Sequence, residues 1–124
     1  MNAFEDRLRA ICGSIDGAIA ATLMGVDGIP VQTHLVAAEP EGELDVPSLL
    51  VEYSSLIPQV QRSAQMFAAG GLEELSITSE RLVTILRPVT PEYFVALALR
   101  SSANLGKGRY LLRIHAPKLA TELS

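Results

Sequence analysis

The sequence has few of the residues that support disulfide bonding, aromatic ligand pockets or membrane insertion. Of its 124 residues one is cysteine and none is tryptophan, and aromatic residues make up only 5%. A single cysteine, Cys12, excludes a disulfide within the chain. The apolar runs are far shorter than the roughly 18 residues that a membrane-spanning helix needs. We therefore expect neither a disulfide framework nor a transmembrane helix.

Positive charge is also scarce. Ten Lys and Arg residues stand against fourteen Asp and Glu residues, which gives a net charge of −4. A protein that grips phosphate backbones or anionic lipid without specificity needs a basic surface. We therefore expect no nucleic-acid partner and no membrane insertion.

The motifs of common catalytic and binding sites are incomplete. A phosphate-binding loop needs a glycine five residues before its Gly-Lys pair and a hydroxyl residue after it, but Ser101 and Gly108 occupy those two positions. His34 and His115 have no metal-ligand spacing with each other or with the lone cysteine. We therefore expect no catalytic residue, no cofactor and no metal, and we predict that the chain is not an enzyme.

Length and apolar content indicate a folded domain. Apolar residues make up 48% of the sequence and charged residues 19%, which excludes a disordered tail. A chain of 124 residues predicts one domain that spans residues 1–124. Glu5 and Asp6 lie where a signal peptide would have an apolar core, so a cytoplasmic location is expected.

Hydrophobic periodicity predicts helices and strands in the order α-β-β-α-β-β-β-α. Apolar residues at steps of three and four indicate helices, and alternation indicates strands. Asp27-Gly28 between two strand-like runs predicts a hairpin turn. The predicted helices are 3–14, 46–69 and 104–123; the predicted strands are 18–24, 29–36, 75–78, 81–88 and 92–100, with a solvated loop at 37–45.

Pro58 lies inside the longest predicted helix, where its missing N–H predicts a kink or a split. The first and last helices are expected to cover one face of the sheet, and the long helix the other. The predicted fold class is therefore α+β, with a five-stranded antiparallel sheet between helices.

Two regions are candidates for pairing between copies of the chain. Leu75 and Ile77 lie in a short strand at the start of the meander, and an unpaired strand edge there is a liability unless another chain covers it. Val51 and Met66 lie off the main apolar stripe of the long helix. They are either a helix contact of a homodimer or scattered surface residues.

The predicted hairpin turn is a candidate contact for another protein. Val26 and Ile29 place two apolar side chains beside Asp27, at a turn that is normally polar. The alternative is that both apolar side chains pack down onto the neighbouring helix.

Three strings, taken in order, resemble the roadblock/dynein light chain family, and within it the bacterial Mgl-type regulators of a Ras-like motility GTPase. They are GVDGIPV at 25–31, LVTILRP at 82–88 with YFVAL at 93–97, and NLGKGRYLLR at 104–113. The resemblance covers nearly the whole chain. It implies a roadblock-like five-stranded sheet between helices, dimers that pair the long helix and the third strand, and a platform for small GTPases without catalysis by the chain itself.

The function expected from these observations is a noncatalytic, homodimeric scaffold or regulator. Its expected partner is a Ras-like GTPase, or another roadblock protein that regulates one, in bacterial cell polarity or gliding motility. Two alternatives stay open at this point: a small-molecule sensor that uses a cavity between sheet and helices, and a purely structural adaptor.

Overall fold

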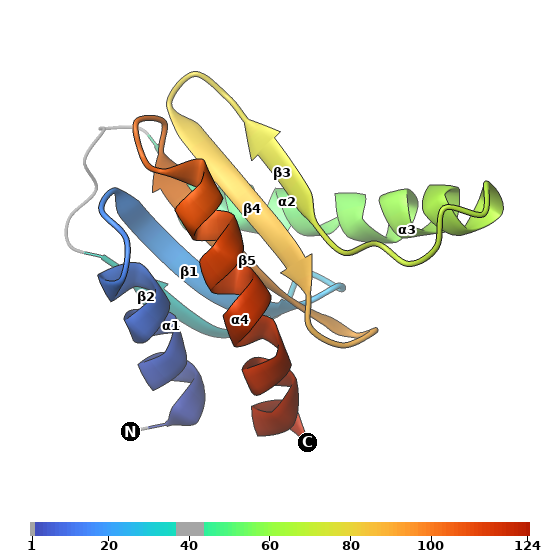
Figure 1. Cartoon of the computed structure of the whole chain (residues 1–124), viewed down its shortest axis with the longest axis horizontal. Coiled ribbons are helices and arrows are strands. Elements are labelled where there is room, and N and C mark those ends of the chain that lie inside the picture. Colours follow the sequence, from blue (N-terminus) through green and yellow to red (C-terminus); the bar gives the residue numbers. More distant parts are fainter. Residues whose placement is uncertain (1, 37–43) are drawn as a thin grey trace.

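The element order in the structure follows the predicted one. The structure is a computed structural model that describes residues 2–36 and 44–124, so most of the predicted loop 37–45 lies outside the described residues. Its helices are α1 (Ala3–Gly13), α2 (Val46–Ser54), α3 (Leu56–Met66) and α4 (Leu105–Leu123), and its strands are β1 (Ala18–Gly25), β2 (Pro30–Leu35), β3 (Leu75–Thr78), β4 (Leu82–Pro88) and β5 (Tyr93–Arg100) (Figure 1).

The five strands form one antiparallel sheet in the order β2-β1-β5-β4-β3. The hairpin β1–β2 and the meander β3–β4–β5 are confirmed, and with them the α+β fold class. Pairing of β1 with β5 joins the two units, for example at Ala21 opposite Leu97. The outermost strands are therefore β2 and β3.

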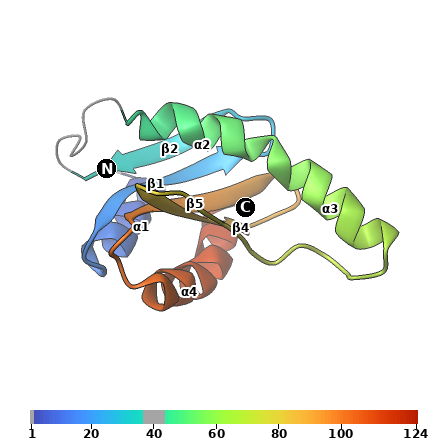
Figure 2. The same ribbon diagram turned by 90° about the horizontal axis from the view of Figure 1, so that it is seen from above.

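Helices cover both faces of the sheet (Figure 2). α1 and α4 cover one face, as predicted, and α2 covers the other. Each central strand is buried on both faces, because alternate side chains enter opposite layers. In β5, for example, Leu97 joins the core under α1 and α4, whereas Ala96 and Ala98 join the core under α2.

Gly108 explains how closely α4 approaches the sheet. A Cβ atom at this position would lie 2.9 Å from Leu99 Cδ1 and 3.0 Å from Ile85 Cδ1. Gly108, which stands where a phosphate-binding loop would have a hydroxyl residue, is thus a packing residue in this fold.

The long helix is split, as its proline predicts. α2 ends at Ser54 and α3 begins at Leu56, because Pro58 has no N–H to donate to the carbonyl of Ser54 four residues earlier. Ser55 keeps helical dihedral angles (φ −67°, ψ −19°), so the two helices follow one another as a single rod, residues 46–66 (Figure 2). The rod ends at Met66 rather than at the predicted residue 69, and the chain turns through a left-handed residue at Ala68 (φ 60°).

Candidate protein interaction surfaces

α3 extends past the β3 side of the sheet, away from the rest of the molecule (Figures 1 and 2). Of the residues of α3, all of which the structure describes, Ile57 alone is buried, and it lies in the first turn. The rod therefore packs on the chain's own sheet up to about Ile57 and continues beyond it.

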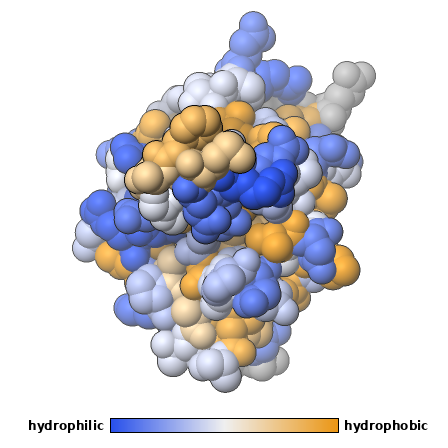
Figure 3. All heavy atoms as spheres, turned by 90° about the vertical axis from the view of Figure 1, so that its right-hand side faces the viewer, coloured by the Kyte–Doolittle hydropathy of each residue, from blue (hydrophilic) through white to orange (hydrophobic). Residues whose placement is uncertain are grey.

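An apolar face runs along this projecting helix. We call Leu56, Val60, Ala64 and Phe67 the α3 stripe; they follow one another at steps of four, four and three. Leu56 is 36% exposed and Phe67 79%, while Val60 and Ala64 are half-buried. Figure 3 shows apolar side chains gathered at the free end of α3, where Met66 and Phe67 are both exposed.

Apolar periodicity predicts the long helix that contains the α3 stripe, but it does not predict that the stripe is exposed. The signal was present in the lengths. A helix over 46–69 is about 36 Å long at roughly 1.5 Å per residue, whereas five strands spaced about 4.8 Å apart extend about 20 Å from first to last. A helix that crosses the sheet must therefore project beyond it.

β3 forms the sheet edge next to the projecting helix. Leu75 and Ile77 are half-buried and pack against the core under α2, while Ser76 and Thr78, which alternate with them along the strand, are exposed. Only β4 pairs with β3 among the described strands. Leu75 and Ile77 therefore lie in a strand at the open edge of the sheet, and they face the layer that α2 covers.

The other two predicted dimer residues lie apart from each other. Met66 is 75% exposed at the free end of α3. Val51 is on α2 beside the β1–β2 turn, where a Cβ added to Gly28 would be 3.6 Å from Val51 Cγ1. Met66 thus belongs to the projecting end, and Val51 to the surface around the hairpin.

The hairpin turn is held by its own residues. Asp27 Oδ1 accepts a hydrogen bond from the Ile29 backbone N–H (3.0 Å), and Gly28 has a left-handed φ of 88°. The backbone N–H of Val26 donates to the carbonyl of Glu92 (2.9 Å), which ties the turn to the start of β5.

The two apolar residues of the turn differ in exposure. Val26 is half-buried and packs against the core under α2, whereas Ile29 is 66% exposed. Asp27 is exposed as well as holding the turn. The structure therefore presents Ile29 and Asp27 outward on a rigid turn and keeps Val26 largely inside.

A groove lies beside this turn, between β2 and α2. Its volume is about 170 Å³, and its lining includes Met24, Pro30, Thr33, Pro47 and Val51. Pockets for drug-sized ligands are usually larger, roughly 300–1,000 Å³. The groove therefore gives no support to a small-molecule site between sheet and helix.

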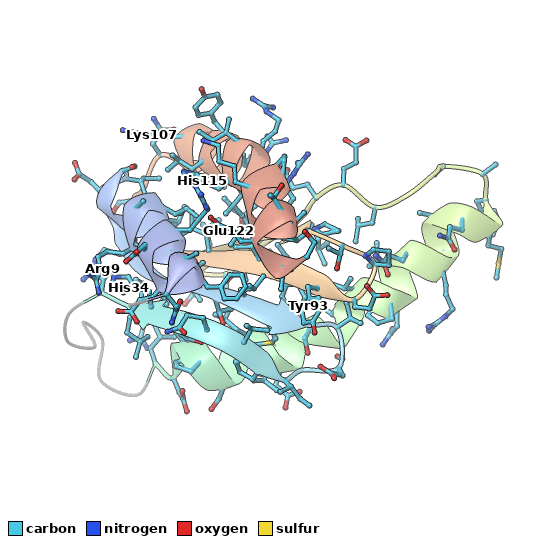
Figure 4. All side chains as sticks on the ribbon, turned by 90° about the horizontal axis from the view of Figure 1, so that it is seen from below. Arg9, His34, Tyr93, Lys107, His115 and Glu122 are labelled. Carbon is cyan, nitrogen blue, oxygen red and sulfur yellow. The ribbon has the colours of Figure 1, made fainter. Side chains whose placement is uncertain are left out.

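A polar cluster joins α1 to α4. Arg7 Nη2 donates to Glu122 Oε2 (2.6 Å), and Arg7 Nη1 donates to His115 Nδ1 (3.3 Å). Figure 4 shows His115 and Glu122 reaching from α4 toward α1. Burial lowers the pKa of His115, and the charges of Arg7 and Lys118 lower it further, while Glu122 acts in the opposite direction. We call these residues the α1–α4 clamp, and we assign it a structural role.

Cys12 is buried in the core between α1 and the sheet, and burial raises the pKa of its thiol to about 11. The thiol is therefore protonated at neutral pH.

Within residues 2–36 and 44–124, no three His, Cys, Asp or Glu side chains are grouped so as to hold a metal ion. None of the helices in these ranges has the length and apolar content to cross a bilayer.

Known structures place the chain in a family. No protein-family model matches the sequence, and a search of curated proteins gives no match. The chain is 39% identical to MglC from Myxococcus xanthus, over 96% of this chain and 98% of that one, with a TM-score of 0.67. The fold is also similar to a Roadblock/LC7 domain from Streptomyces avermitilis (12% identity, 96% of both chains, TM-score 0.81). A third match is the gliding protein MglB from Thermus thermophilus (16% identity, 98% of this chain and 92% of that one, TM-score 0.79). With a near-complete fold match and this level of identity to MglC, the chain belongs to the roadblock/LC7 family and, within it, to the Mgl-type motility regulators.

Proposed function

We propose that this chain is a noncatalytic, homodimeric scaffold in the regulation of a Ras-like small GTPase. It binds the GTPase itself or a sister roadblock protein that regulates it, in bacterial cell polarity or gliding motility. The 39% identity to MglC, over nearly the whole of both chains, supports the regulatory role.

The observation that carries the homodimer is the α3 stripe beside the open β3 edge. An apolar helix face that projects past its own sheet loses the free energy of burial unless another surface covers it. An open strand edge likewise has unpaired N–H and C=O groups. A second copy related by a twofold axis supplies both partners at once, because its own β3 and α3 meet the same elements of the first copy.

The proposed contact with a further protein is the β1–β2 turn. Ile29 supplies an exposed apolar anchor, and Asp27 supplies a charge beside it. Because hydrogen bonds hold the turn, binding there orders little new backbone, which lowers its entropic cost. The proposed effect on the GTPase is to order the GTPase's own residues, a common way of switching such proteins.

The test combines sedimentation with a hydrolysis assay. The purified chain is expected to sediment as a dimer at micromolar concentration. Mixed with the Ras-like GTPase and the sister roadblock proteins of its source cell, it is expected to bind one of them and to change GTP turnover only when that complex forms. A stable monomer, or turnover of a substrate by the chain alone, would contradict the proposal.

The small-molecule alternative is tested in parallel by thermal unfolding with metabolites and nucleotides. The scaffold proposal expects no large rise in melting temperature with any of them. A large rise with one compound, together with no binding to a GTPase or roadblock protein, would favour the sensor instead.

A further inference from the structure

We call residues 29–36, which run from the hairpin turn along the outermost strand β2, the β2 edge. We infer that the β2 edge takes up an extended segment of a partner protein as an added strand, and that this segment carries Lys or Arg side chains. The inference rests on the proposed contact of a further protein at the hairpin turn. It extends that contact from two side chains, Asp27 and Ile29, to the backbone of the strand that follows them, and it assigns the charge of the partner.

Exposed apolar side chains gather on the β2 edge. Of the ten large apolar side chains that are exposed in the described part of the chain, four lie in this one segment: Ile29, Val31, Leu35 and Val36. A fifth, Val51 of α2, lies beside the hairpin turn. Single apolar residues scattered over a surface need no explanation, but a group of them marks an interaction site.

No charged residue protects this edge. Strands at the edges of sheets usually carry Lys or another charged residue, which prevents them from pairing with other chains. The sequence of β2 is PVQTHL, without Asp, Glu, Lys or Arg. Its proline is the first residue of the strand, next to the turn, so it does not interrupt pairing further along. The strand from Val31 to Leu35 is therefore open to pairing.

The backbone of β2 presents two residues outward. The Val36 N–H donates to the carbonyl of Ile19, which precedes the pairing of β1 with β2 (2.9 Å). Because bonding alternates along an antiparallel pair, Leu35 and Thr33 direct their own N–H and C=O groups away from β1. Among residues 2–36 and 44–124, β1 is the only strand that pairs with β2. Leu35 and Thr33 thus offer the backbone groups that an added strand requires.

The surface around β2 is acidic. All ten Lys and Arg residues of the chain lie outside residues 10–61, whereas seven of the fourteen Asp and Glu residues lie within them. This stretch forms β1, β2 and α2. Asp27 lies in the turn at one end of β2. Asp45 caps the start of α2 near the other end, where Pro47 lines the same groove as Thr33 (Figure 2).

A second copy of this chain does not suit the β2 edge. Two copies paired there would bring together two acidic surfaces, and their like charges would oppose the contact. α1 packs beside β2 on the other face of the sheet, but its two arginines, Arg7 and Arg9, are paired with Glu122 and Glu5. A segment with Lys or Arg meets the acidic groups with opposite charge. Charge complementarity therefore favours a different protein as the occupant.

The groove between β2 and α2 gives the added strand a place for a side chain. Thr33 lines the groove together with Pro47 and Val51 of α2. Leu35, two residues after Thr33, lies on the same face of the sheet. When a strand is added to a sheet edge, the main chain supplies affinity, and pockets for alternate side chains supply specificity. We assign the groove, about 170 Å³ in volume, to an apolar side chain of the added strand.

Amide hydrogen exchange tests the added strand. The probe is the purified GTPase or sister roadblock protein that the wild-type chain binds in the assay described under the proposed function. In that complex, exchange of the Thr33 and Leu35 amides is expected to slow by about tenfold or more, because a neighbouring strand accepts their hydrogen bonds. The Val36 amide already donates to Ile19 and is the internal control, which should change less than about threefold. Unchanged exchange at both outward amides would overturn the added strand.

Two substitutions at one position test the charge of the partner. Leu35→Lys and Leu35→Glu remove the same side chain, which is 51% exposed, and add charges of opposite sign. We expect Leu35→Lys to bind the same probe about tenfold more weakly than Leu35→Glu, because only the lysine repels a basic segment. Calorimetric titration measures both, and the difference should shrink at high salt. Circular dichroism checks that both variants are folded. Binding by Leu35→Glu that is as weak or weaker would overturn the basic segment.

The outcomes separate the added strand from the proposed hairpin contact. If Ile29→Ser weakens binding while exchange at Thr33 and Leu35 is unchanged in the wild-type complex, the added strand is wrong and the hairpin contact stands. If the chain binds none of the GTPase and roadblock proteins, both are wrong. If the two amides become protected with rising concentration of the chain alone, the occupant is a second copy and the inference is wrong.

Discussion

Thr84 contains a buried hydroxyl that the fold leaves unsatisfied. The residue is 1% exposed in β4, and its Oγ1 has no hydrogen-bond partner among the described residues. A polar group in this situation has lost water and gained nothing in return. We expect Thr84→Val, which replaces the hydroxyl by a methyl group, to raise the free energy of unfolding by about 1 kcal/mol. Denaturant unfolding at one fixed protein concentration measures this.

Thr22 is the matched control for Thr84→Val. It is equally buried in β1, but its Oγ1 lies 2.8 Å from Thr33 Oγ1 and 3.1 Å from the carbonyl of Gln32. Thr22→Val removes these hydrogen bonds, and it should lower the free energy of unfolding by roughly 1–3 kcal/mol. Destabilisation by Thr84→Val of the same size would mean that the Thr84 hydroxyl does have a partner.

At the scale of elements, the α1–α4 clamp makes stability depend on pH. The folded chain holds the pKa of His115 below its ordinary value of 6.5, chiefly through burial and then through Arg7 and Lys118. The unfolded chain therefore binds more protons just below that pH. The contribution of His115 to the free energy of unfolding is therefore complete above about pH 6.5. It is lost as the pH falls toward the lowered pKa of His115 in the folded state.

Variants of the two histidines isolate this contribution. We expect the free energy of unfolding of the wild-type chain to decrease between pH 7.5 and pH 5.5, and His115→Gln to flatten that decrease. His34→Gln is the control because His34 lies on β2, away from the clamp, and it should retain the wild-type slope (Figure 4). An unchanged slope in His115→Gln would assign the pH dependence to other groups.

The elements also show what local pattern can and cannot predict. The steps of three and four that predict a helix, and the proline that splits it, act within a few residues, so the sequence was sufficient for both. Whether Val60 and Phe67 are covered depends on the width of a sheet assembled from distant strands. Periodicity within the helix does not give that width, and only the comparison of helix length with the number of strands indicates it. The same holds for the candidate contact at the hairpin turn. Val26 and Ile29 are both apolar, but Val26 packs against the core and Ile29 is exposed, and the sequence does not distinguish the two.

At the scale of the whole molecule, we expect substitutions to disrupt the proposed dimer surface and the proposed hairpin contact independently of each other. Ile29→Ser removes the exposed anchor of the hairpin while leaving Asp27 to hold the turn, so we expect a dimer that binds its GTPase or roadblock partner at least tenfold more weakly. Val60→Asp should instead yield a monomer with an intact hairpin. Sedimentation and a pull-down with the identified partner measure both properties. A loss of dimer in Ile29→Ser, or unchanged binding by that variant, would contradict this division.

In the proposed homodimer, the projecting α3 would make function depend on gene dosage. When a helix face is buried only in the dimer, the concentration of dimer rises with the square of the chain concentration, as long as most chains are monomers. A cell that halves its synthesis of this protein then loses about three quarters of the paired form. Modest changes in expression would thus have disproportionate effects on the process that the protein serves.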